Sequence, residues 1–295
     1  MDSIRKLPAA AGAEWVLGGF ALLRRAPLAL GMLGALWGLL ASLVVTLGAA
    51  VPALATALQL LVALAGPVLF AGLVWAVREV AHGRAAQPAH LLQGVHEGRV
   101  PALLATLLPQ LAAGLLLGVL LLVLVGSQQL QHLAQVSEQL NTMAQAGQQP
   151  TPEEVQALIG DLPAGRILLW LLLGFAAAVA VALTVFVSVP RILFDRRDGL
   201  AAMGDSLRAC LHNLPAIAVF FLLVMVSVFA IYFVVLIVTV VLQLLAGPML
   251  ALWVAQVLMM AVLMPLLAGA VYTAWIQLFG EAAAAAAPVA GQLEA

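Results

Sequence analysis

The stretch "PAIAVFFLLVMVSVFAIYFVVLIVTVVLQLL", which runs from Pro215 to Leu245, contains no Asp, Glu, Lys or Arg and decides the class of fold. An α-helix rises about 1.5 Å per residue and the hydrocarbon core of a bilayer is about 30 Å thick, so about 20 such residues cross a membrane. Other stretches free of acidic and basic residues have a similar length: Pro27 to Val51, Pro52 to Val77, Pro101 to Val125, Ile167 to Val189 and Pro248 to Phe279. The sequence therefore predicts six transmembrane helices.

The composition of the whole chain supports the same class. Of its 295 residues, 65% are hydrophobic and only 8% are charged, whereas a soluble domain has roughly 25% charged residues. The apolar runs are also too long and too continuous for the alternating strands of a membrane β-barrel. We therefore expect an all-α polytopic membrane helix bundle, in which residues 1–295 form a single integral membrane domain, joined by amphipathic interfacial helices on the cytoplasmic side.

The basic residues are distributed unevenly between the two sides of the predicted bundle. Of the 12 Lys and Arg residues, only Arg166 lies outside the N-terminal segment and the loops that follow the second and fourth apolar runs. Because positive residues are retained on the cytoplasmic side, both termini and these two loops are predicted to be cytoplasmic. The richness in Ala, Leu, Gly and Val suggests a bacterial source, and hence the bacterial inner membrane.

Three similar units are suggested by the positions of three prolines. Pro27, Pro101 and Pro215 each open an apolar run and each follow a basic segment, namely "EWVLGGFALLRRAP", "HLLQGVHEGRVP" and "MGDSLRACLHNLP". One interpretation is a repeat of an interfacial helix and a hairpin, with units 11–77, 85–189 and 200–279 and an extracytoplasmic insertion at 126–165. The other is that every hairpin starting from the cytoplasm needs a basic flank and a proline at its first turn.

The insertion at 126–165 has a helical pattern of its own. Apolar residues recur at helical spacing beneath a Gln-rich face: Leu130, Leu133, Val136, Leu140 and Met143. This spacing predicts an amphipathic helix, and "TPEEVQALI" from Thr151 predicts a second, shorter one. The first helix could lie on the outer leaflet, cap the bundle or bind a partner.

A further amphipathic helix is predicted between the fourth and fifth apolar runs. Leu200, Met203, Leu207, Cys210, Leu211 and Leu214 fall on one face at 100° per residue, with Asp205, Arg208 and His212 opposite. Asp198 precedes this helix as a cap. We interpret it as a helix lying at the membrane surface with Cys210 facing lipid, although a catalytic or ligand site in this loop is the alternative.

Basic residues beside these helices are predicted to meet lipid. At the headgroup level each is worth about 1 kcal/mol with anionic lipid. The predicted lipid-interface residues are Arg24, Arg25, Arg191, Arg196, Arg197 and Arg208.

The sequence offers little sign of chemistry. The six apolar runs carry no Asp, Glu, Lys or Arg, and intramembrane enzymes and ion-coupled transporters usually need such groups. Nucleophile, zinc-protease and phosphate-binding motifs are missing from the sequence, and the spacing of His82, His90 and His96 matches no metal site. Cys210 is the single cysteine. We expect no catalytic residue, metal or cofactor, and no nucleic-acid partner.

Uncharged features of the apolar runs concern packing. Gly34 with Gly38, and Gly114 with Gly118, form G-x-x-x-G pairs that allow helices to approach closely. Prolines inside the runs, which are Pro67, Pro109 and Pro265, should bend them. The glutamines of the runs are expected to tie helices together: Gln59, Gln110, Gln243, Gln256 and Gln277.

Two segments carry a family resemblance. The stretches "EWVLGGFALLRRAPL" and "SLRACLHNLPA" resemble a family of proteobacterial inner-membrane proteins that have about six helices and no established activity. The resemblance implies the same six-helix topology and transfers no functional residue.

Three functions are compatible with this sequence. The first is a non-enzymatic inner-membrane protein, a scaffold or accessory subunit that contacts lipid, a protein partner or further copies of itself. The second is a permease or flippase for apolar or lipid-like solutes, and the third is an intramembrane enzyme. A continuous polar cavity lined by the glutamines and bent at Pro67 and Pro265 would favour transport, whereas a closed bundle would favour a scaffold.

Overall fold

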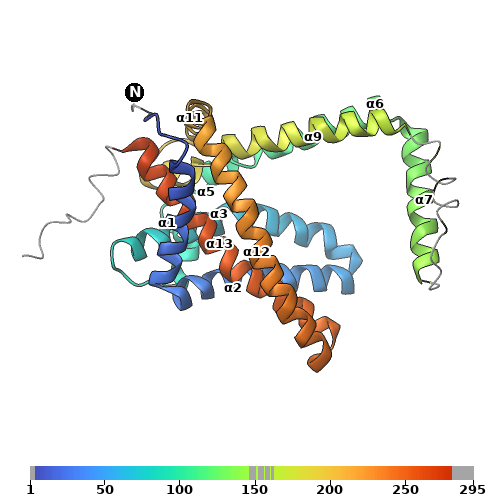
Figure 1. The fold of residues 1–295 in the computed structure, drawn as a ribbon, viewed down its shortest axis with the longest axis horizontal. Helices are drawn as coiled ribbons and strands as arrows, with labels where there is room; N and C mark the ends of the chain where they lie inside the picture. The colour runs from blue at the N-terminus through green and yellow to red at the C-terminus, as the bar shows by residue number, and fades with distance from the viewer. Residues whose placement is uncertain (1–3, 146–150, 152–155, 157–159, 161–162, 281–295) are drawn as a thin grey trace, which may run out of the picture. The chain divides into compact units, whose positions relative to one another are not determined.

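The computed structural model describes residues 4–145 and 163–280, together with Thr151, Gln156 and Gly160. Within these residues every regular element is a helix (Figure 1). Six segments are long and apolar enough to cross a membrane: Pro27–Ala50, Pro52–Ala81, Val100–Leu124, Ala164–Phe194, Leu214–Ala246 and Pro248–Phe279. The prediction of an all-α polytopic bundle with six spans is confirmed, and the chain is an integral membrane protein.

Prolines occupy one of the first two positions of six described α-helices, because a first-turn residue has no intrahelical partner for its N–H and proline therefore loses nothing there. Three helices start at a proline: α2 (Pro27–Ala50), α3 (Pro52–Ala81) and α13 (Pro248–Phe279). Three have proline as their second residue: α5 (Val100–Ala105), α6 (Leu108–Leu124) and α12 (Leu214–Ala246). Gly247 has a φ of +85°, which lets the chain turn directly from α12 into α13.

The third span is divided. Helix α5 ends at Ala105, and α6 (Leu108–Leu124) starts three residues later with Pro109 as its second residue. Pro109 lies inside this span, as expected, and the helix is interrupted just before it. Pro67 and Pro265 do lie inside their helices, α3 and α13.

The chain forms two compact units. The first unit is Met1–Leu107 with Leu183–Ala295, and the second unit is Leu108–Ala182. The single-domain interpretation, the three repeats and the insertion at 126–165 remain predictions.

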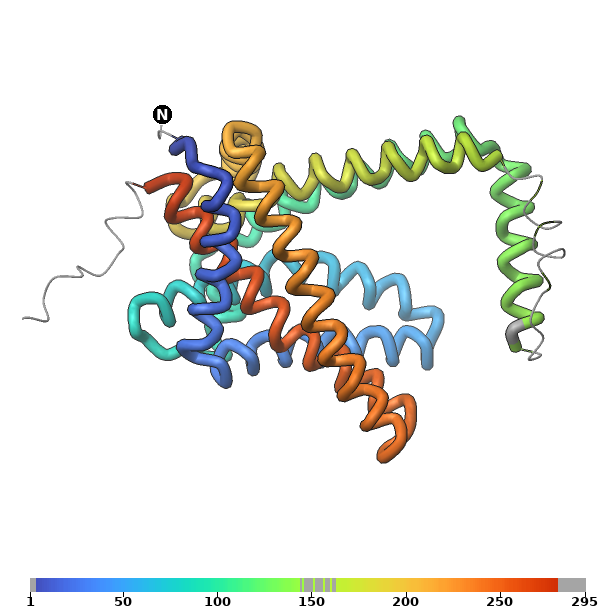
Figure 2. Tube along the Cα trace, in the orientation of Figure 1, coloured from blue at the N-terminus to red at the C-terminus, as the bar shows by residue number. Residues whose placement is uncertain are grey.

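Helix α13 is the centre of the first unit. It contacts α1 (Ala11–Arg25), α2, α3 and α12, and Figure 2 shows the blue α1 beside the red α13. Glycines set these approaches. A Cβ atom on Gly19 would overlap the backbone of Leu266, and one on Gly38 would lie 2.9 Å from the Cα of Val257. The Gly34 and Gly38 pair is thus a helix contact, on α2 against α13.

An aromatic anchor fixes α1 in the same unit. Trp15 is fully buried, and its ring lies 5.8 Å from that of Phe186 and 5.9 Å from that of Phe220. Its indole Nε1 donates a hydrogen bond of 2.8 Å to Oε1 of Gln277 on α13. The glutamine therefore ties two helices together, as expected.

Asn213 ties the N-terminal segment to the corner between α11 (Gly199–His212) and α12. Its Oδ1 accepts from the backbone N–H of Leu7 at 2.7 Å, and its Nδ2 donates to the carbonyl of Arg5 at 3.0 Å. The side chain is 1% exposed. A buried amide with these partners holds two distant segments in one geometry.

The second unit consists of α6, α7 (Ser127–Gln145) and most of α9 (Ala164–Val185). Trp170 on α9 donates from Nε1 to the carbonyl of Leu117 on α6 at 2.8 Å. The first predicted helix of the insertion is confirmed as α7. The second, from Thr151, lies largely outside the described residues.

Candidate functional site

The charged stretch between the fourth and fifth spans forms two helices and a short turn. Helix α10 (Ser188–Phe194) is followed directly by Asp195, and α11 begins at Gly199. Asp198 caps α11, because its carboxylate accepts from the backbone N–H of Leu200 at 3.2 Å. This cap is the one that the sequence predicts.

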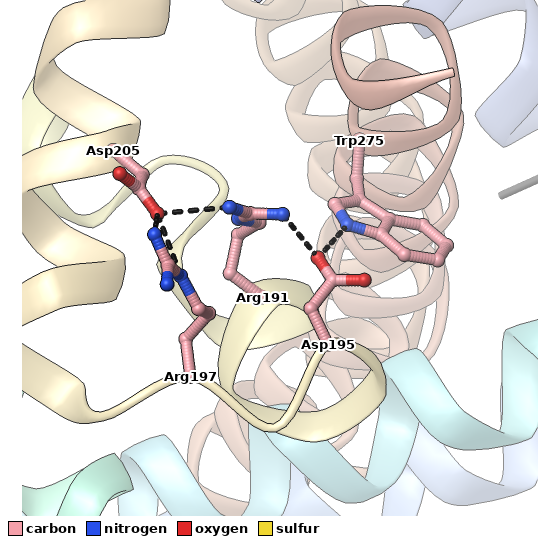
Figure 3. Close-up of polar contacts among 5 residues, drawn as sticks. All are labelled: Arg191, Asp195, Arg197, Asp205 and Trp275. Atoms are coloured by element: carbon pink, nitrogen blue, oxygen red, sulfur yellow. Dashed lines mark hydrogen bonds and ion pairs between the residues drawn. The ribbon is translucent and has the colours of Figure 1, made fainter. Parts of the chain in front are cut away.

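Arg191 is the centre of the site, and it is 1% exposed. Its Nη1 donates to Oδ2 of Asp195 at 2.7 Å, and its Nη2 donates to Oδ2 of Asp205 at 2.9 Å. Arg197 donates to the same Asp205 oxygen from Nε at 3.1 Å. The indole of Trp275 donates to Oδ2 of Asp195 at 2.9 Å (Figure 3). One chain of charge-assisted bonds therefore links α10, α11 and α13.

Aromatic rings surround these charges. The guanidinium of Arg191 lies 4.3 Å from the ring of Phe279, and that of Arg78 lies 4.6 Å from the ring of Phe194. Both distances suit cation–π attraction. We call the whole group the arginine–aromatic cluster: Trp75, Arg78, Arg191, Phe194, Asp195, Arg197, Asp205, Tyr272, Trp275 and Phe279.

The charged partners of Asp205 determine its protonation. Burial by itself would raise the pKa of this carboxyl, but hydrogen bonds from Arg191 and Arg197 hold the pKa below its ordinary value. The group is therefore ionised at neutral pH. It stabilises the fold above its ordinary pKa and loses that contribution as the pH falls through the lowered value. A lowered pKa also moves Asp205 away from the range that suits general acid–base catalysis.

The predicted lipid-interface arginines fall into different environments. Arg24, Arg25 and Arg208 are exposed. The side chain of Arg196 is 73% exposed and lies 3.5 Å from Glu97, and that of Arg197 is 43% exposed. Of these six arginines, Arg191 and Arg197 are the two that share a partner, since both donate hydrogen bonds to Asp205. Arg191 faces carboxylates of its own chain, and lipid contact by the exposed arginines stays a prediction.

The orientation of α11 differs from the prediction. Cys210 was expected to face lipid, but it is fully buried, and Met203 is 5% exposed. These residues lie on the buried face of α11, which consists mostly of small residues. Ser206 lies on this face between Met203 and Cys210, and its Oγ donates a hydrogen bond to the carbonyl of Leu183 at 2.8 Å. Burial also raises the pKa of Cys210 to about 12. Asp205, expected on the polar face opposite, lies in the arginine–aromatic cluster.

Sequence reasoning missed the aromatic half of this site. Trp275 and Asp195 are 80 residues apart in the chain, and no local pattern pairs them. The one available signal is the spacing of Arg191 and Asp195, four residues apart on a short helix.

A cavity whose lining includes a few polar side chains lies elsewhere in the first unit, between α2 and α13. Its volume is about 270 Å³, and its lining includes Ser42, Thr46, Trp253 and Gln256. Ser42 is 6% exposed, and its Oγ has no hydrogen-bond partner among the described residues. Gln256 is thus a span glutamine that lines this cavity.

In the described part of the chain, no group of three or more His, Cys, Asp or Glu residues could hold a metal ion. His90 instead caps a 3₁₀ turn (Pro88–Leu92), with Nδ1 accepting from the N–H of Gln87 at 3.1 Å.

No family model, no curated protein and no solved structure matches the chain.

Proposed function

We propose that the protein is a non-enzymatic membrane scaffold or accessory subunit of the bacterial inner membrane, with both termini in the cytoplasm. The observation that supports this most is the use of the charges in the arginine–aromatic cluster. Both terminal nitrogens of Arg191 bond to carboxylates of the same chain, and one of those carboxylates also accepts from Trp275. The cluster therefore acts as a brace between helices.

The brace has a consequence for the outer surface. Because the arginine–aromatic cluster fixes α11 against α10, the opposite face of α11 stays exposed on the surface of the first unit. Leu200 is 64% exposed, Leu211 is 54% exposed, and Arg208 lies on the same exposed side. An apolar row with a cation suits contact with a lipid surface or with a partner helix.

The experiment is affinity purification after mild crosslinking in cells. We expect a protein partner, or a second copy of the chain, to co-purify in fixed stoichiometry. The double variant Leu200→Gln/Leu211→Gln should lose this partner at an unchanged level of folded protein. The matched control Leu168→Gln, at a residue of the second unit that is 57% exposed, should keep it. Recovery of the unassociated chain alone, in the wild type, would contradict the proposal.

The second candidate is a permease or flippase for lipid-like solutes. The cavity between α2 and α13 favours it, because Ser42 and Gln256 offer hydrogen bonds inside a span. The test is exchange of a fluorescent phosphatidylcholine between the leaflets of vesicles containing the purified protein. A scaffold should leave the exchange at the rate of protein-free vesicles. A rate that rises with the protein and falls in Ser42→Leu and Gln256→Leu would establish transport and overturn the scaffold.

A further inference from the structure

A second hollow of the first unit is apolar and larger. It lies between α12 and α13, and Phe20 of α1 closes part of it; its volume is about 540 Å³. The lining includes Phe20, Val226, Ala230, Val234, Val238 and Val262. Ser227 also lines it, but the hydroxyl of Ser227 already donates to the carbonyl of Leu223 at 2.8 Å. The groove therefore presents apolar atoms to its occupant.

The dimensions of this groove match one acyl chain. On α12 it extends from Val226 to Val238, which is about 18 Å at 1.5 Å per residue. One leaflet is half of a hydrocarbon core about 30 Å thick, or about 15 Å. Val226 and Val234 are 55% and 61% exposed, so the groove is open along its side.

Two arginines follow Phe20 in the last turn of α1, Arg24 and Arg25. Arg24 follows Phe20 by four residues, so the two side chains lie on the same face of α1. Both Arg24 and Arg25 are exposed. Across residues 4–145 and 163–280, no ion pair joins either arginine to a carboxylate. These two charges are therefore available to an anion from outside the described chain.

We propose that this groove binds one acyl chain of an anionic phospholipid, and that Arg24 and Arg25 hold the phosphate of its headgroup. Such a lipid contacts α1, α12 and α13 together and stabilises the packing of α1. This site is independent of whether the protein is a scaffold or a permease.

The test measures lipid binding to the purified full chain in mild detergent. Phosphatidylglycerol and phosphatidylcholine with identical acyl chains are added separately, and the bound lipid is counted by native mass spectrometry. We expect one phosphatidylglycerol per chain and a higher unfolding temperature, because a ligand of the native state stabilises it. Phosphatidylcholine and inorganic phosphate should each bind at least about tenfold more weakly.

Two kinds of variant separate the headgroup from the acyl chain. Arg24→Gln/Arg25→Gln should weaken phosphatidylglycerol binding by about 30-fold, since two headgroup charges are lost. Ala230→Phe should abolish binding by filling the groove, and Val234→Phe, at a residue that is 61% exposed, provides the same test if Ala230→Phe does not fold. Arg208→Gln is the matched control and should bind like the wild type.

Two outcomes would overturn this proposal. Equal binding of the two lipids, unchanged in Arg24→Gln/Arg25→Gln, would exclude the headgroup site. Phosphatidylglycerol binding that survives both groove-filling variants would show that the arginines attract the lipid without the groove.

Discussion

The hairpin of α2 and α3 and the hairpin of α6 and α9 are equally suited to a membrane but differ in their contacts with protein. The second pair is at least as hydropathic as the first. In each helix of the first pair, 33% of the 18-residue apolar stretch is buried by protein. The buried fraction of the corresponding stretch is 0% in Val100–Leu124 and 6% in Ala164–Phe194. Hydropathy thus reports that a helix can enter a bilayer and does not report whether another helix packs against it.

The glycine pairs of α2 and α6 make the same distinction. A Cβ on Gly34 or Gly38 would meet the backbone of α13, but one on Gly114 or Gly118 would meet nothing within 4 Å. Because lipid tails are as apolar as leucine, association between spans depends on close packing of small residues. A glycine pair contributes only where a partner helix lies over it.

The largest effect is expected at Arg191, in the first unit. Arg191→Met leaves Asp195 and Asp205 with fewer of their cationic partners in a buried place, which should lower the free energy of unfolding by about 3–5 kcal/mol. The measurement is unfolding of the detergent-solubilised protein by heat or by sodium dodecyl sulfate.

Arg166→Met, at the exposed arginine of the second unit, is the matched control. It should change the free energy of unfolding by no more than about 0.5 kcal/mol. If both variants lowered the free energy of unfolding equally, the arginine of the first unit would be no more important for stability than that of the second unit.

A smaller loss is expected from overpacking α2. Gly34→Leu inserts a side chain where α13 lies against the backbone, and this should lower the free energy of unfolding by about 1–3 kcal/mol. Gly118→Leu should cause no loss, because its position is open. If Gly118→Leu destabilises the protein as much as Gly34→Leu, another helix covers α6.

Substitutions at two turn residues with positive φ should change the free energy of unfolding in opposite directions, each by about 1 kcal/mol. Arg196 has a φ of +53° and Gly126 of the second unit has a φ of +88°. Left-handed backbone is unfavourable for a residue with a Cβ, so Arg196→Gly should stabilise the protein and Gly126→Arg should destabilise it, each by about 1 kcal/mol. Unfolding midpoints measure both. A loss of stability in Arg196→Gly would show that the arginine side chain matters more than the backbone strain.

The last prediction concerns reactivity and leaves stability unchanged. Cys210 has a pKa raised from 9.0 to about 12 by burial, so its thiolate at pH 8 is about 1,000-fold scarcer than that of a free thiol. A maleimide should label the wild type only after unfolding. Ser127→Cys in a Cys210→Ser background, exposed in the second unit, should react in the folded protein. Prompt labelling of native Cys210 would place it at an accessible surface.

The spans could be predicted from the sequence because their signals are local. An uncharged run and a proline at its first turn lie within one segment, and the helices at Pro27, Pro52 and Pro248 start where those prolines stand. The cap at Asp198 is local in the same way.

The site could not be predicted, because its partners are distant in the chain. Arg191 looks like other arginines beside a span until Asp205 is placed next to it and Trp275 is placed next to Asp195. Cys210 belongs to a continuous apolar face in the sequence, but in the structure Cys210 is buried whereas Leu200 and Leu211 of the same face are exposed. Gly34 and Gly118 have identical spacing, and only their neighbours differ.

The central place of α13 has a consequence for biosynthesis. The glycine surfaces of α1 and α2 pack on α13, yet Gly269 is made long after Gly19. At about 5–20 residues per second, the interval between them is about 12–50 seconds. During that interval the Gly34 and Gly38 surface is already in the membrane without its partner. Assembly of this protein therefore depends on keeping an early helix unpaired until the last one has been synthesised.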